Sequence, residues 1–105
     1  MIIAFSVAPS VTDERAEMAD AVAQAVRVVR ESGLPNQTNA MFTLIEGEWD
    51  EAMAVVKRAT DEVLKVSPRA SLVIKADIRP GHTGQLTHKV EAVERRLADP
   101  QESEE

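Results

Sequence analysis

The sequence predicts a single α+β domain in which helices cover one face of an antiparallel sheet. Apolar residues alternate with a period of two in some stretches and recur at helical spacing in others. These stretches follow the order strand, helix, two strands, helix, strand, helix. This order is the split βαβ arrangement called ferredoxin-like, with an additional C-terminal helix. A chain of 105 residues fits one such domain, which we place at residues 1–97.

The first strand and the first helix are predicted from residues 2–33. The segment "IIAFSVA" alternates between two faces, and Pro9 ends the strand. Ser10 and Asp13 have the spacing of a capping box, and an amphipathic helix then runs to about Ser32. Gly33 suits the left-handed position that follows a helix end.

The acidic segment "IEGEWDE" could be a metal site or only the start of a helix. Residues 36–46 are rich in sheet-forming residues and predict two short strands or one bent ribbon. From Trp49 onward the apolar residues follow a helical stripe, and Asp50 and Glu51 fall in its first turn, near the positive end of the helix dipole. The carboxylates straddle a strand end, a turn and a helix start, so we favour helix-start chemistry over a metal. Trp49 is expected to pack in the core.

The last strand is predicted at residues 70–79 and the final helix runs from Thr83, as N-cap, to Leu97. The acidic tail, residues 98–105, has nothing to bury and is expected to be flexible. The sheet residues expected to face the helices are Ile3, Phe5, Val7, Leu72, Ile74 and Ile78. Those expected on the other, open face are Ile2, Ala4, Ser6, Thr43, Ile45, Lys75 and Asp77.

The open face has two interpretations. Small residues beside Lys75 and Asp77 would suit a ligand pocket. The spacing alone favours the other interpretation, in which the face is exposed or dimer-facing and Lys75 and Asp77 merely pair. Its apolar residues predict at least a dimer and favour a tetramer, because such a patch is a liability on a small monomer.

Composition excludes several classes of function. A net charge of -6 with a pI near 4.9 argues against nucleic-acid binding. The absence of cysteine excludes thiolate metal sites and disulfides, and no apolar run approaches the roughly 18 residues of a membrane span. The start "MIIAFSVAPS" has no basic segment typical of a secretory signal, so a cytoplasmic location is expected.

Three segments, "FSVAP", "GLPNQTNAMFTLIEGEWDEAM" and "LVIKADIRPG", resemble the small thiamine-binding protein family over about residues 1–97. The resemblance implies an oligomeric subunit, dimer or tetramer, that binds thiamine or its hydroxymethylpyrimidine moiety without known catalysis and without a cofactor. Phe42 stands where many relatives have a small residue, which leaves the pocket shape and the exact ligand open. The ligand-site candidates carried over by motif are Ser6, Pro9, Asn39, Thr43, Glu46, Lys75 and Asp77.

An enzyme is disfavoured because His82 and His88 have neither metal-ligand spacing nor a recognisable serine or cysteine partner. Both are expected to be surface histidines. The alternative function is a protein-interaction or regulatory module that uses the open face and binds no thiamine. Stabilisation by thiamine would discriminate between the two.

Overall fold

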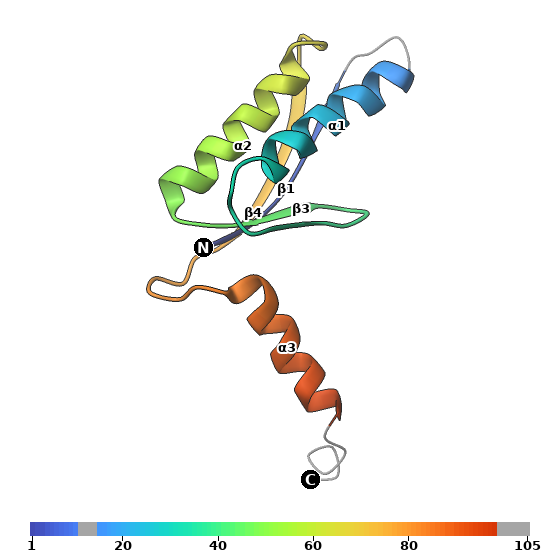
Figure 1. Ribbon diagram of the computed structural model, residues 1–105. Helices are drawn as coiled ribbons and strands as arrows, with labels where there is room; N and C mark the ends of the chain where they lie inside the picture. The colour runs from blue at the N-terminus through green and yellow to red at the C-terminus, as the bar shows by residue number, and fades with distance from the viewer. Residues whose placement is uncertain (11–14, 99–105) are drawn as a thin grey trace.

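The computed structural model of the chain describes residues 1–10 and 15–98. The predicted order of elements is confirmed, and the fold is ferredoxin-like with an extra C-terminal helix (Figure 1). Its elements are β1 (Ile2–Pro9), α1 (Arg15–Arg30), β2 (Asn36–Thr38), β3 (Thr43–Glu46), α2 (Trp49–Leu64), β4 (Ala70–Asp77) and α3 (Gln85–Ala98). Asp13 of the predicted capping box and nearly all of the predicted tail lie outside the described residues.

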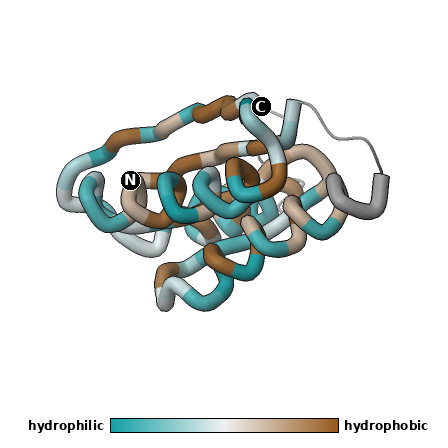
Figure 2. Tube along the Cα trace, turned by 90° about the horizontal axis from the view of Figure 1, so that it is seen from above, coloured by the Kyte–Doolittle hydropathy of each residue, from teal (hydrophilic) through white to brown (hydrophobic). Residues whose placement is uncertain are grey.

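The four strands form one antiparallel sheet in the order β2-β3-β1-β4. Helices α1 and α2 pack against each other and against β1, so both cover the same face (Figure 1). Along these helices apolar residues recur between hydrophilic ones (Figure 2), which gives each helix one face for the core. The buried core consists of Ile3, Phe5, Val7, Ala21, Ala25, Val29, Ile45, Ala52, Val55, Val56, Ala59 and Val63.

The register of the strands corrects part of the predicted face assignment. Phe5 pairs with Thr43 and Ile3 pairs with Ile45, so Thr43 and Ile45 share the helix-covered face. Placing these two residues on the open face was wrong, because directly paired residues point to the same side of a sheet. The open face instead carries Ile2, Ala4, Ser6, Leu44, Glu46, Val73, Lys75 and Asp77.

Glu48 and Glu51 of the acidic segment serve the start of α2, as predicted, whereas Glu46 of the same segment contacts α3. The backbone N–H of Glu48 donates to Oε1 of Glu51 at 2.9 Å. A Cβ atom at Gly47 would lie 3.0 Å from that same oxygen, so glycine gives Glu51 room to fold back. The prediction that Trp49 packs in the core was wrong, since 55% of it is exposed. Trp49 is the first residue of α2 and precedes Ala52, the first buried position of the helix.

Helix α3 projects away from the two-layer body (Figure 1). It starts at Gln85, after Gly84, so the predicted N-cap at Thr83 lies one residue too early. Leu86 is the one buried residue of this helix. Across the described ranges 1–10 and 15–98, no helix has the length and apolarity needed to cross a membrane.

Candidate functional site

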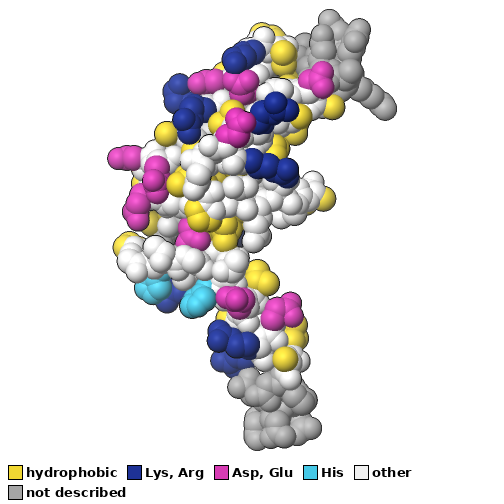
Figure 3. Space-filling model, viewed as in Figure 1, with side chains coloured by type: hydrophobic (Ala, Val, Ile, Leu, Met, Phe, Trp, Pro, Cys, Tyr) yellow, Lys and Arg dark blue, Asp and Glu magenta, His cyan; other side chains and the backbone are white. Residues whose placement is uncertain are grey.

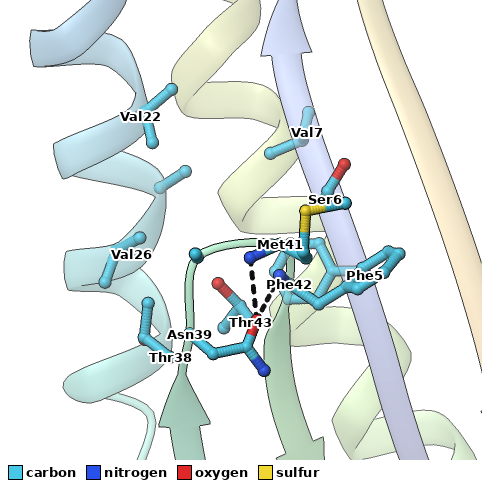
Figure 4. Close-up of a pocket in the computed structure, with 12 residues that line it drawn as sticks. Phe5, Ser6, Val7, Val22, Val26, Thr38, Asn39, Met41, Phe42 and Thr43 are labelled. Carbon is cyan, nitrogen blue, oxygen red and sulfur yellow. Dashed lines mark hydrogen bonds between the residues drawn. The ribbon is translucent and has the colours of Figure 1, made fainter.

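A cavity of about 150 Å³ opens between α1, β1 and the loop that joins β2 to β3 (Figure 4). Val22 and Val26 lie four residues apart on α1 and therefore line the same wall. Phe5 and Val7 alternate toward this side on β1. The polar residues in its lining are Ser6, Thr38, Asn39 and Thr43. An apolar wall with a few polar groups is the usual character of a small-molecule site.

Asn39 shapes the loop beside the cavity. Its Oδ1 atom accepts the backbone N–H groups of Met41 and Phe42, each at 2.8 Å (Figure 4). Its own backbone N–H donates to the carbonyl oxygen of Phe42 at 3.0 Å. The side-chain oxygen is thus committed to the turn. No described residue accepts a hydrogen bond from Nδ2 of Asn39, so this nitrogen is available as a donor.

Thr43 supplies the second polar group. It is 8% exposed, and its hydroxyl has no hydrogen-bond partner among the described residues. The described side chains leave no fully buried polar atom unpaired, so the Thr43 hydroxyl reaches the open cavity. A hydroxyl both donates and accepts, which complements the donor of Asn39. The side chain of Phe42 borders the same space and offers an apolar ring beside these groups (Figure 4).

The structure divides the residues suggested by the sequence into separate places. Asn39 and Thr43 meet at the cavity, whereas Ser6 borders it on β1 but belongs to the open face of the sheet. Lys75 pairs in register with Ala4 on the open face, while Pro9 is buried where β1 pairs with the start of β4.

Glu46 and Asp77 instead contact α3. The carboxylate of Glu46 accepts the backbone N–H of Gln85 at 2.9 Å and that of Leu86 at 3.2 Å. Asp77 forms an ion pair with Lys89 at 2.5 Å, so the alternative interpretation, in which Asp77 pairs with Lys75, was wrong. The hydrogen bond and charge of Lys89 lower the pKa of Asp77 below its ordinary value.

Sequence reasoning missed Thr38 and the wall formed by Val22 and Val26. Their signal was only an ordinary amphipathic stripe and a short polar strand, and neither pattern distinguishes a cavity from a core. The described residues contain no group of three or more histidine or acidic side chains that could hold a metal ion. His82 and His88 are exposed, as predicted.

Comparison with known proteins assigns the family. A family model described as thiamine-binding protein matches residues 3–94. The UPF0045 protein Mb1933 of Mycobacterium bovis is 53% identical over 102 residues, which cover 96% of this chain and 98% of that protein.

Solved structures show the same fold. The crystal structure of hypothetical protein MJ1052 from Methanocaldococcus jannaschii superposes with a TM-score of 0.77 at 27% identity, covering 88% of this chain and 93% of that chain. A Thermotoga maritima protein, TM0486, shares the fold with a TM-score of 0.74 at 22% identity, covering 88% and 96% of the two chains. With the family model matching nearly the whole length, this chain belongs to the thiamine-binding protein family.

Proposed function

We propose that this protein binds thiamine, or its hydroxymethylpyrimidine moiety, in the cavity beside α1 without catalysing a reaction. Family membership supports the ligand class. The main support for this binding site is the Thr43 hydroxyl, which is nearly buried, faces an apolar cavity and has no hydrogen-bond partner among the described residues. A polar group in such surroundings gains more from a ligand hydrogen bond than an exposed one does.

The chemistry of an aminopyrimidine fits the groups that remain available. Its ring nitrogens accept hydrogen bonds and its exocyclic amine donates them. In this proposal Nδ2 of Asn39 donates to a ring nitrogen and the Thr43 hydroxyl accepts from the amine. In this proposal the Phe42 side chain contacts the flat ring of the ligand, and its bulk leaves room in the cavity for one heterocycle.

The size of the cavity favours one ring over the whole vitamin. Its volume of about 150 Å³ is half the lower end of the roughly 300–1,000 Å³ typical of sites for drug-sized ligands. The thiazolium of thiamine would therefore extend toward solvent. A chain with a net charge of -6 tolerates that positive ring.

A binding role without catalysis agrees with the lining of the cavity. Its described residues include no acidic, basic or histidine side chain, and these are the groups that most often transfer protons in active sites. We further propose that the protein is a homo-oligomer, either a dimer or a tetramer, because apolar residues on the open sheet face and on α3 remain exposed in one copy.

Calorimetry with thiamine, the free hydroxymethylpyrimidine and the free thiazole alcohol tests the site. Thr43→Val should weaken pyrimidine binding by about 2- to 12-fold, the worth of one ordinary hydrogen bond of about 0.5–1.5 kcal/mol. Thr60→Val on α2, whose hydroxyl donates to the carbonyl oxygen of Val56 away from the cavity, is the matched control and should bind normally.

Asn39→Asp tests the role of the Nδ2 donor separately. The carboxylate can still accept the N–H groups of Met41 and Phe42, so the turn is kept, but the Nδ2 donor is lost. Weaker binding of the pyrimidine with unchanged folding is the expected result. Equal affinity for the free thiazole, or no binding of any ligand at millimolar concentration, would refute the proposed site.

A further inference from the structure

A second cavity, of about 160 Å³, lies where the starts of β1 and α3 meet the end of β4. Figure 3 shows histidine side chains next to a basic side chain in this region, where the two-layer body meets the projecting helix. The charged and polar residues that line the cavity are Asp77, Arg79, His82, Gln85 and Lys89. Two permanent cations and a histidine thus face one carboxylate. The cavity therefore has an excess of positive charge in a chain whose net charge is -6.

Arg79 and His82 have groups that are free to bind a ligand. Within residues 1–10 and 15–98, the guanidinium of Arg79 forms no ion pair or hydrogen bond. Nδ1 of His82 lies 3.2 Å from the carbonyl oxygen of Pro80. Because a carbonyl only accepts, Nδ1 carries the hydrogen, and Nε2 has no partner in the same ranges. A planar guanidinium pairs with two oxygens of one oxyanion, and a phosphate keeps further oxygens for the histidine and for Lys89.

Asp77 shows that the cations of this cavity act on one shared anion. Its carboxylate pairs with Lys89, and the hydrogen bond and charge of Lys89, followed by the charge of Arg79, lower the pKa of Asp77. The side chains of Lys89 and Asp77 are 58% and 52% exposed. An exposed ion pair contributes little to stability, so Lys89 can exchange Asp77 for a more highly charged anion at small cost.

An apolar surface adjoins these charges. A smaller cavity of about 120 Å³ shares Met1, Arg79 and His82 with the larger one. Its lining also includes Glu48 and the apolar residues Trp49, Ile78 and Pro80. Trp49 is 55% exposed and Ile78 is 56% exposed, so the described chain leaves both side chains largely uncovered. An exposed indole beside an arginine offers a flat apolar face to the organic part of a bound anion.

We propose that Arg79, His82 and Lys89 bind the phosphoryl group of a phosphate monoester whose aromatic organic part lies against Trp49. A phosphate monoester carries a charge of about -1.5 to -2 at pH 7, which exceeds the single charge of Asp77. The larger cavity has room for this group, because about 160 Å³ corresponds to roughly five water molecules and a phosphate group has a similar number of non-hydrogen atoms.

The proposed site is separate from the cavity beside α1. Ile2 borders the phosphate site and Phe5 borders the other cavity. The two residues lie three positions apart on β1, about 10 Å along the strand, and point to opposite faces of the sheet. The inference therefore does not depend on the proposed pyrimidine site, and either can fail without the other.

Calorimetry at low ionic strength, with phenyl phosphate and inorganic phosphate as probes, tests the site. Arg79→Gln should weaken the binding of phenyl phosphate by about tenfold or more, because it removes hydrogen bonds between charged groups. Arg95→Gln is the matched control, since it removes the same charge from an exposed position of α3 outside both cavities. An equal loss in the two variants, or no binding of phenyl phosphate to the wild type at millimolar concentration, would overturn the inference.

Asp77→Asn tests the displacement of the internal anion. Removing this competitor frees Lys89, so phenyl phosphate should bind about two- to fivefold more tightly, the worth of an exposed ion pair. Asp61→Asn is the matched control, because Asp61 forms a similarly exposed pair with Lys57 on α2 and its loss should leave the affinity unchanged. Equal affinity of Asp77→Asn and the wild type would contradict a shared site for the carboxylate and the phosphate.

Trp49→Ala separates an ester from the free anion. The wild type should bind phenyl phosphate more tightly than inorganic phosphate, and Trp49→Ala should remove this preference while leaving the affinity for inorganic phosphate unchanged. Equal binding of the two probes by the wild type would overturn the phosphate monoester as the ligand. Thr43→Val, in the cavity beside α1, should bind phenyl phosphate normally, and a loss there would place the probe in the wrong cavity and overturn the inference.

Discussion

Replacing Glu46 with alanine separates a role in the fold from a role in ligand binding. The family resemblance suggested Glu46 as a ligand residue, whereas in the structure its carboxylate accepts the backbone N–H groups of Gln85 and Leu86. These bonds join positions 39 and 40 residues apart and are a direct attachment of α3 to the sheet. Glu46→Ala should therefore destabilise the docked helix without touching the cavity beside α1.

The magnitude follows from the two bonds. A hydrogen bond to a charged group stabilises the folded protein by about 1.5–3 kcal/mol, and the protein loses this contribution when a buried N–H is left without a partner. Water can replace the carboxylate at Gln85, which is only partly buried, but less readily at Leu86, which is 8% exposed. We expect Glu46→Ala to lower the free energy of unfolding by about 2–4 kcal/mol. Glu46→Gln keeps one acceptor oxygen and should cost about half as much.

Urea unfolding at a fixed protein concentration measures this loss. The control is Glu91→Ala, which removes an exposed carboxylate from the same helix and should change the free energy of unfolding by less than about 0.5 kcal/mol. An unchanged stability of Glu46→Ala would contradict the anchoring role. If the variant also lost affinity for the pyrimidine, Glu46 would return to the ligand site.

Two further substitutions test other corrected residues. Trp49→Ala should cost about 1 kcal/mol or less in urea unfolding, because the side chain is mostly exposed; a loss of about 3–5 kcal/mol would indicate a buried anchor instead. Lys89→Met should raise the pKa of Asp77 toward its ordinary value in a carboxyl NMR titration, and an unchanged titration would mean that the pair does not form in solution. Since the pKa of folded Asp77 is lowered, the stabilisation is present above the ordinary pKa of 3.8 and is lost as the pH falls through the lowered value.

The order of helices and strands could be predicted because it rests on local periodicity. Each element keeps its own pattern of apolar residues whatever it packs against. The acidic segment around Glu51 was also interpreted correctly, since a helix start depends on neighbours a few residues away. Which side of the sheet each residue of a short strand occupies is harder to predict, because shifting the strand by one residue moves every side chain to the opposite face. That is why Thr43 and Ile45 were misassigned, while the longer β1 was not.

The candidate site depends on contacts that no local pattern contains. Family resemblance supplied Ser6, Asn39 and Thr43, and the fold brings the last two together at the cavity. The wall from α1 could not be predicted, because a valine that lines a cavity and one that fills a core follow the same stripe. The attachment of α3 to Glu46 could not be predicted either, since the sequence around a carboxylate at a strand end does not indicate a partner 39 residues away.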